Sequence, residues 1–281
     1  MLEFSKIANR YSVVRKLHNR GLTTVFLARD ERGDDRQVVA ELTPIGRDEA
    51  PELAERRRAM LGLLTQLEHP NLAAVIDATV DAPYLCVVKA WETGVPLFEW
   101  LAAGEGEAWP QRVALARDVL EGLAALHSAG LLHRDLRPRN VWVTTSGGRP
   151  TAQLDHFLEV VPEGEPGGTQ VGDPKRWPPE VLRAGEYSRR SDIYSVGLLL
   201  FDLLSRRDRV GDFDGAPTEA DLDTVPPPYG DVVRRACRPF SVERFDDGLD
   251  LLAAFDAMDL KRRLAEAGFD DGDGDGGFGF G

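Results

Sequence analysis

The segment LLHRDLRPRNVWV, residues 131–143, combines side chains that are suited to chemistry on a hydroxyl group. Asp135 and Asn140 lie five positions apart, and the basic residue Arg137 stands between them. A carboxylate at this place could act as a base that orients a hydroxyl, and a nearby amide oxygen could help to hold a metal ion. The question is whether the rest of the chain forms a site that brings a reactant to these groups.

Short runs of β-branched and aromatic residues predict a small sheet over residues 1–93. Two such runs separated by NRGL predict a hairpin, and QVVAEL, AAVIDA and YLCVVKAW predict three further strands. Apolar residues at helical spacing predict one amphipathic helix over 48–67. We therefore expect five strands and one helix in the first third of the chain.

From Gly94 onward the pattern becomes helical. A long helix is predicted to end at Gly130, since glycine is a common stop signal. Further helices are predicted over residues 191–205, 229–237 and 246–267. Residues 268–281, GFDDGDGDGGFGFG, are of low complexity, and we expect a disordered tail there.

The composition indicates a soluble protein of the cytoplasm. The formal charge of −13 argues against nucleic acids and membranes as partners, because a phosphate-binding surface needs a basic face. The N-terminus lacks the apolar run of a signal peptide, and the longest apolar stretch is interrupted by Asp202 and too short to span a bilayer. Cys86 and Cys237 lie in apolar runs, and we expect buried thiols in a reducing compartment.

Further motifs follow the segment at 131–143 in the order that is typical of protein kinases. LDHF at 154–157 resembles the Asp-Phe-Gly motif, PPE at 178–180 resembles Ala-Pro-Glu, and SDIYSVG at 191–197 resembles the helix that anchors the catalytic loop. With HRDLRPRN, these motifs make the chain similar to bacterial serine/threonine protein kinases over about residues 11–256.

This resemblance implies an α+β fold with two lobes. A small, five-stranded antiparallel N-lobe with one helix would cover residues 1–93, and a larger, mostly helical C-lobe would cover residues 94–267. The resemblance also implies structural roles for Asp192, which would accept backbone N–H groups of the catalytic loop, and for an ion pair of Glu180 with Arg244.

The resemblance assigns the catalytic segment as follows. Asp135 is the base that orients a substrate hydroxyl, and Asn140 and Asp155 hold Mg²⁺ if a nucleotide binds. Arg137 stands for the lysine of the catalytic loop. His133 is expected to be a packed core histidine, and Arg134 is either an internal ion-pair partner, which we favour, or a receiver for a phosphate.

The nucleotide-binding motifs are degenerate. The glycine-rich strap is replaced by LHNRGLTTV, in which His18, Arg20 and Thr23 occupy the three glycine positions. Arg20 either reaches a phosphate or, as we favour, faces solvent at a hairpin tip. Glu41 takes the position of the lysine that neutralises the phosphates, and Met60 takes the position of the glutamate that normally holds that lysine.

The adenine slot is expected to be filled by larger side chains. The degenerate pocket would be formed by Val25, Val39 and Trp142, together with Glu41 and Lys89. Trp142 replaces a leucine on the floor of the slot, a change of volume that a packed site does not absorb freely.

Two ion pairs are predicted to compensate for the missing charges. Lys89 falls at the position called the gatekeeper, and we expect it either to pair with Glu41 or to keep its head in water. Arg137 is predicted to lie between Asp135 and Asp173 and to neutralise both.

The favoured interpretation is a pseudokinase, which acts as a signalling or regulatory binding module with impaired ATP binding and phosphotransfer. Its partners would be other signalling proteins, and no cofactor is predicted. The alternative is an active serine/threonine kinase that uses Mg-ATP and borrows Lys89 or Lys16 for the phosphates. A small-molecule phosphotransferase is a third interpretation, which the PPE and SDIYSVG motifs disfavour.

Overall fold

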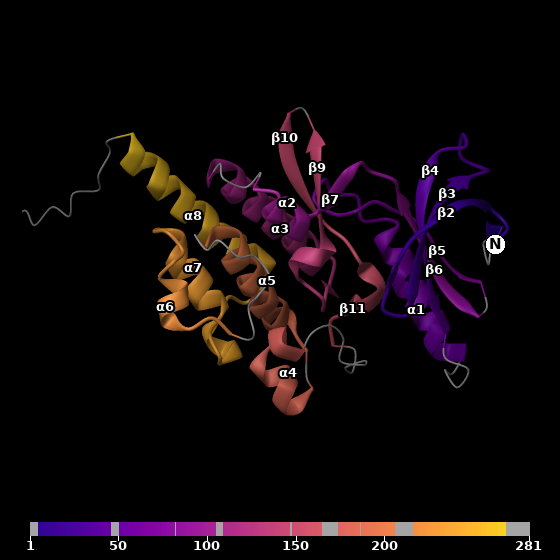
Figure 1. The fold of residues 1–281 in the computed structure, drawn as a ribbon. Helices are drawn as coiled ribbons and strands as arrows, with labels where there is room; N and C mark the ends of the chain where they lie inside the picture. Colours follow the sequence, from indigo (N-terminus) through magenta and orange to yellow (C-terminus); the bar gives the residue numbers. More distant parts are fainter. Residues whose placement is uncertain are drawn as a thin grey trace, which may run out of the picture.

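A computed structural model shows a sheet-rich lobe and a helical lobe (Figure 1). The structure describes residues 5–45, 51–81, 83–104, 109–146, 148–164, 174–185, 187–205 and 216–267. The predicted tail at 268–281 lies outside these residues. In the described part of the chain, no helix is both long and apolar enough to cross a membrane.

The N-lobe is built on one antiparallel sheet with the strand order β1-β2-β3-β4-β6-β5. Its strands are β1 (Lys6–Ile7), β2 (Tyr11–Arg20), β3 (Thr23–Asp30), β4 (Gln37–Pro44), β5 (Val75–Asp81) and β6 (Tyr84–Ala90). The helix α1 (Pro51–Leu64) is the predicted amphipathic helix. The fold class is confirmed, with one correction: the sheet has six strands, because the two residues of β1 pair with the start of β2.

Alternation along these strands divides the N-lobe sheet into two faces. One face carries a small apolar core that includes Tyr11, Phe26 and Val88. The other face turns toward the C-lobe. Val25 is paired with His18 on one side and with Glu41 on the other, so these three side chains share the second face.

The C-lobe is mostly helical. Its helices are α2 (Leu97–Ala102), α3 (Trp109–Ser128), α4 (Pro179–Ala184), α5 (Arg189–Leu204), α6 (Glu219–Leu222), α7 (Tyr229–Ala236) and α8 (Gly248–Glu266). The long helices predicted at α3, α5, α7 and α8 are confirmed to within a few residues, and Gly130 has the left-handed φ of 72° that suits a helix stop. Apolar side chains of α3, α5, α7 and α8 form one core.

Short strands carry the functional loops at the top of the C-lobe. The strands β7 (Gly94–Pro96), β9 (Val141–Ser146) and β10 (Arg149–Leu154) form a sheet in the order β10-β9-β7, and β8 (Leu131–Leu132) pairs with β11 (Val161–Pro162). Because β9 begins directly after Asn140 and β10 ends directly before Asp155, this small sheet holds both residues at one end.

A backbone seam joins the two lobes. The N–H of Ala73 donates to the carbonyl of Leu154 (2.9 Å), and the N–H of Leu154 donates to the carbonyl of Asn71 (2.9 Å). The side-chain amide of Asn71 also donates to the carbonyl of Ala152 (2.9 Å). The segment before β5 is therefore fixed to β10, which positions the N-lobe sheet above Asp155.

Candidate active site

The catalytic loop is held by a buried carboxylate on α5. Asp192 accepts the backbone N–H groups of His133 (2.7 Å) and Arg134 (2.9 Å), and the hydroxyl of Tyr187 (2.7 Å). The role predicted for Asp192 is confirmed. His133 is fully buried and packs against Phe157, as expected for a core histidine. Asp192 therefore fixes the backbone of the loop directly before Asp135.

Asp135 and Asn140 meet within this loop. The amide nitrogen of Asn140 donates to the backbone carbonyl of Asp135 (2.8 Å) and to its carboxylate (2.5 Å). The amide oxygen of Asn140 is buried and has no hydrogen-bond partner among the described residues. An unused acceptor of this kind is an available ligand for a cation. The N–H of Asp155 donates to the carbonyl of Asn140 (2.9 Å), which places Asp155 next to it.

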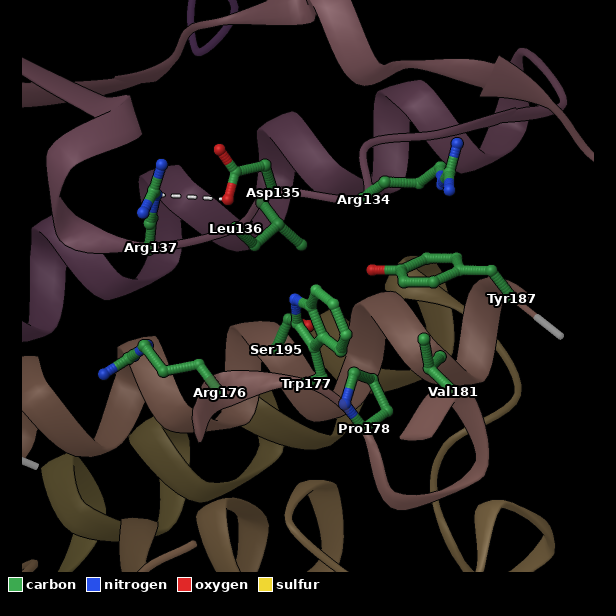
Figure 2. Close-up of a pocket in the computed structure, with 10 residues that line it drawn as sticks. All are labelled: Arg134, Asp135, Leu136, Arg137, Arg176, Trp177, Pro178, Val181, Tyr187 and Ser195. Atoms are coloured by element: carbon green, nitrogen blue, oxygen red, sulfur yellow. Dashed lines mark ion pairs between the residues drawn. The ribbon is translucent and has the colours of Figure 1, made fainter. Parts of the chain in front are cut away.

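Arg137 forms half of the predicted bridge. Its Nε lies 3.1 Å from Oδ1 of Asp135, and the pair is drawn in Figure 2. Asp173, the other predicted partner, lies outside the described residues. The guanidinium of Arg137 is about a quarter exposed, so it shields one side of the Asp135 carboxylate and can still move away.

A pocket opens beside Asp135 on the side of α4 and α5 (Figure 2). It holds about 450 Å³ of empty space, part of it open to solvent, between the catalytic loop and the side chains of Arg176, Trp177 and Val181. Arg176 donates to Asp202 (2.8 Å), which anchors it to α5. The pocket therefore lies between solvent and the carboxylate of Asp135.

The predicted ion pair of Glu180 and Arg244 holds the wall of this pocket in place. The two nitrogens Nη1 and Nη2 of Arg244 donate to the two carboxylate oxygens of Glu180, at 2.7 and 2.9 Å. The Arg244 side chain is completely buried. The structural role predicted for this pair is confirmed, and it fixes the N-terminus of α4 to the body of the C-lobe.

The predicted ion pair between Glu41 and Lys89 is also confirmed. The Nζ of Lys89 lies 2.7 Å from Oε1 of Glu41, and both side chains are almost fully buried. Lys89 has a second partner that the sequence reasoning missed, the carboxylate of Asp155. The signal was present, because Asp155 was expected in the cleft and an N-lobe lysine that faces the cleft must come close to it.

These contacts shift the pKa values of Lys89 and Asp155. Burial alone would raise the pKa of Asp155, but the ammonium of Lys89 and, to a lesser degree, Arg20 lower the pKa to about 2. Burial would likewise lower the pKa of Lys89, but Asp155 and Glu41 outweigh it and the net shift is upward. The ammonium and the Asp155 carboxylate are thus both charged near neutral pH.

Arg20 does not face solvent, contrary to the interpretation we favoured from the sequence. Its side chain is only 14% exposed, and Nη1 lies 4.0 Å from Oε1 of Glu41. The bulge in β2 between Lys16 and His18 follows a first one between Val13 and Arg15, and the two offset each other in the alternation. His18 and Arg20 therefore pair with Val25 and Thr23 and lie on the cleft face of the sheet.

The side chains expected at the adenine slot lie where the sequence placed them, and that they fill the slot stays a prediction. Val25, Val39 and Trp142 line a cleft between the lobes, in which about 580 Å³ of empty space includes space open to solvent. Gly94 gives Trp142 its place: a Cβ there would lie 2.7 Å from Nε1 of Trp142, so the glycine leaves room for the indole against β7.

The donor set fits Mg²⁺ bound together with a phosphate. Among the described residues, no three His, Cys, Asp or Glu side chains gather into a metal cluster. Asn140 and Asp155 instead could supply two oxygen ligands from the protein, which is the usual number where Mg²⁺ keeps substrate phosphates and water as its other ligands. Met60, at the expected glutamate position, is simply part of the apolar core.

Comparisons with known proteins agree with this geometry. The family model "Protein kinase domain" matches residues 11–224. Serine/threonine-protein kinase pkn2 of Myxococcus xanthus is 30% identical over 208 residues, which are 70% of this chain and 24% of that protein. PknL of Mycobacterium tuberculosis is 29% identical over 279 residues, which are 94% of this chain and 69% of that protein. This chain thus spans about a quarter of the Myxococcus protein.

A solved structure gives the same fold. A double mutant of the Mycobacterium tuberculosis PknI kinase domain superposes with a TM-score of 0.66 and 21% sequence identity, over 92% of this chain and 99% of that one. At this identity the likeness concerns the fold alone.

Proposed function

This chain belongs to the protein kinase domain family, and we propose that it transfers the γ-phosphate of ATP to serine or threonine hydroxyls of proteins, with Lys89 in place of the lysine that β4 lacks. The observation that carries the proposal is the position of one nitrogen. The Nζ of Lys89 contacts Asp155, the residue expected to hold Mg²⁺, although Lys89 comes from β6. An amine therefore lies beside the metal site without a lysine at position 41.

The residues on the hydroxyl side of the reaction are complete. Asp135 lies at the head of the pocket in Figure 2, where its carboxylate can accept the proton of an incoming hydroxyl. Asn140 holds this carboxylate in place through its amide nitrogen and keeps its amide oxygen for the metal. Arg137 must swing away from Asp135 when the substrate hydroxyl arrives.

The nucleotide side is held by charges in the cleft. Asn140 and Asp155 would hold Mg²⁺, which would neutralise the negative charge of the transferring phosphoryl group. The ammonium of Lys89 would donate to the phosphates in one of two ways. It would either leave Glu41 or divide its three N–H donors between Glu41 and the phosphates. Phosphoryl transfer depends mainly on such positioning and charge neutralisation, so the strand that supplies the lysine matters less than where its Nζ lies.

The test is transfer of label from Mg-[γ-³²P]ATP to casein by the wild type and by three variants. Asp135→Asn and Lys89→Met should each lower the transfer rate by at least a hundredfold. Lys16→Met should not change it, since Lys16 is exposed on β2 and is not among the residues that line the cleft. Transfer by the wild type that persists in Asp135→Asn would refute the assignment.

A second candidate is the pseudokinase, and one observation favours it. Lys89 is already neutralised by two carboxylates, and the Glu41 side chain would repel a triphosphate. In that case the domain acts by binding another signalling protein. It would show no label transfer, and Mg-ATP would leave its melting temperature unchanged, because only a ligand of the folded state raises it.

A further inference from the structure

We propose that Arg20 is a phosphate-binding residue of the cleft, and that its side chain replaces the backbone contacts that a glycine-rich strap would make. This inference rests on the proposed function, since it takes the ligand to be a nucleotide di- or triphosphate. It concerns binding only and can be tested apart from phosphotransfer.

The hairpin lacks the glycines that let backbone N–H groups approach a phosphate closely. Arg20 pairs with Thr23 and Asn19 pairs with Thr24, so side chains stand at these positions of the β2–β3 ladder. Within the described β2–β3 hairpin only Gly21 has a positive φ, 58°, and it lies at the tip beside Leu22, which is 81% exposed. A side chain is therefore the candidate donor to a phosphate at this place.

The side chain of Arg20 points into the cleft. After the bulge, the pairs His18–Val25 and Arg20–Thr23 are two residues apart, so the side chain of Arg20 lies on the same face as Val25 and Glu41. Arg20, Lys89 and Asp155 all line the same cleft. The cleft therefore carries two cationic side chains, from two different strands.

The guanidinium of Arg20 has a donor nitrogen that makes no hydrogen bond to the described residues. Its Nη1 is buried and has no hydrogen-bond partner among the described residues, and its approach to Glu41 stops at 4.0 Å. At this distance the two groups attract each other without forming a hydrogen bond. The other carboxylate oxygen of Glu41, Oε2, is also buried without a partner among the described residues. A buried donor of this kind is costly unless a ligand satisfies it.

The charges of the cleft favour a phosphate at Arg20. Burial and then Arg20 lower the pKa of His18, so this imidazole of the hairpin stays neutral. The positive charge near the hairpin is thus carried by Arg20 and Lys89. A guanidinium binds two phosphate oxygens side by side, which gives it an advantage over a lysine at a site without backbone donors.

The experiment compares ligands that differ only in their phosphates. Calorimetric titration of the full chain with adenosine, ADP and ATP in excess Mg²⁺ should give markedly tighter binding for ADP and ATP than for adenosine. Arg20→Met should weaken ADP and ATP binding about tenfold to a hundredfold and leave adenosine binding unchanged. Arg20→Lys should recover part of the loss. Arg15→Met, an exposed arginine on the same strand, is the matched control and should bind like the wild type.

The outcomes separate this inference from the proposed function. Equal losses for adenosine and ADP, or ADP binding that Arg20→Met does not weaken, overturn the role of Arg20. If Arg20→Met unfolds, the same comparison is made with Arg20→Lys, and ADP affinity equal to that of the wild type together with unchanged adenosine affinity overturns it. ADP binding that depends on Arg20 without any label transfer supports Arg20 and overturns the kinase activity. No binding of any nucleotide by the wild type overturns both.

Discussion

Glu41 and Lys89 lie diagonally opposite each other on β4 and β6, with 2.7 Å between Oε1 and Nζ. Lys89 is paired with Val39, two residues from Glu41, so both side chains point from the same face of the sheet into the cleft. The acid occupies the strand position where the family has its lysine, and the base occupies the neighbouring strand. The ammonium thus comes from β6 and its acidic partner from β4, and the ammonium lies beside Asp155.

Removing Lys89 should destabilise the fold strongly. Lys89→Met leaves Glu41 and Asp155 buried without their cation, and breaking a buried pair in this way costs about 3–5 kcal/mol. The free energy of unfolding in urea measures the loss. The double variant Glu41→Lys/Lys89→Met returns an ammonium to β4 and should regain part of it. Stability of Lys89→Met equal to that of the wild type would show that the three charges do not interact as described.

A methyl group at Gly94 should disturb the floor of the cleft. In Gly94→Ala the new Cβ meets Nε1 of Trp142 at 2.7 Å and also the carbonyl of Val143, so we expect a loss of about 1–3 kcal/mol and a shift of tryptophan fluorescence. The control is Gly62→Ala in α1, where a Cβ has open space and should stabilise the helix by about 0.5–1 kcal/mol. A neutral Gly94→Ala would mean that Trp142 does not pack against β7.

The Glu180–Arg244 pair should matter more than a larger surface network. Arg244→Met removes a fully buried guanidinium from Glu180 and should cost about 3–5 kcal/mol in the free energy of unfolding. Arg234 on α7 contacts three exposed carboxylates, and Arg234→Met should cost less than about 1 kcal/mol. Urea denaturation of both variants makes the comparison, and equal losses would contradict it.

Acid should destabilise the fold through two carboxyl groups of the C-lobe. Burial alone would raise the pKa of Asp192 and of Glu180, but hydrogen bonds, chiefly from His127 and Arg244 respectively, bring both below their ordinary values of 3.8 and 4.5. Both groups therefore bind protons more weakly in the folded than in the unfolded chain. Their contribution is complete above about pH 5 and is lost as the pH falls below 4.

The measurement is the free energy of unfolding between pH 6 and pH 3. Asp192→Asn should be less stable than the wild type at pH 6 and should lose less on acidification, because it lacks one of the two groups. If the free energy of unfolding of Asp192→Asn fell with pH to the same extent as that of the wild type does, Asp192 would be excluded as a source of the acid dependence.

The fold and the catalytic loop could be predicted from the sequence because local rules determine them. Strand alternation and helical spacing marked the elements, and the spacing of Asp135, Asn140 and Asp192 placed the loop. The Glu41–Lys89 pair was also predictable, since each charge stood at a position with a known orientation in the family. The elements followed from the order of residues along the chain, whereas the roles of the loop residues and the ion pair followed from the resemblance to the family.

The state of the cleft could not be predicted in the same way. Arg20 enters it because its pairing with Thr23 places it on the cleft face, and no turn residue marks the two offsetting bulges in β2 that set this pairing. Trp142 fits against β7 because Gly94, almost 50 residues away in the chain, makes space for its ring. Both effects depend on which backbones lie side by side, so they follow from tertiary structure and not from residue type.

The seam between Asn71–Ala73 and the end of β10 limits how the two lobes can move. If the lobes moved straight apart at the seam, the hydrogen bonds of Ala73 and Leu154 would break. A rotation of one lobe about the line of the seam would keep these hydrogen bonds. Under the proposed function, a nucleotide should then enter by a rotation of the N-lobe sheet about this line. The same seam means that a fragment cut at Gly94 would expose Leu72 and unpaired backbone groups, so the halves should fold only as one unit.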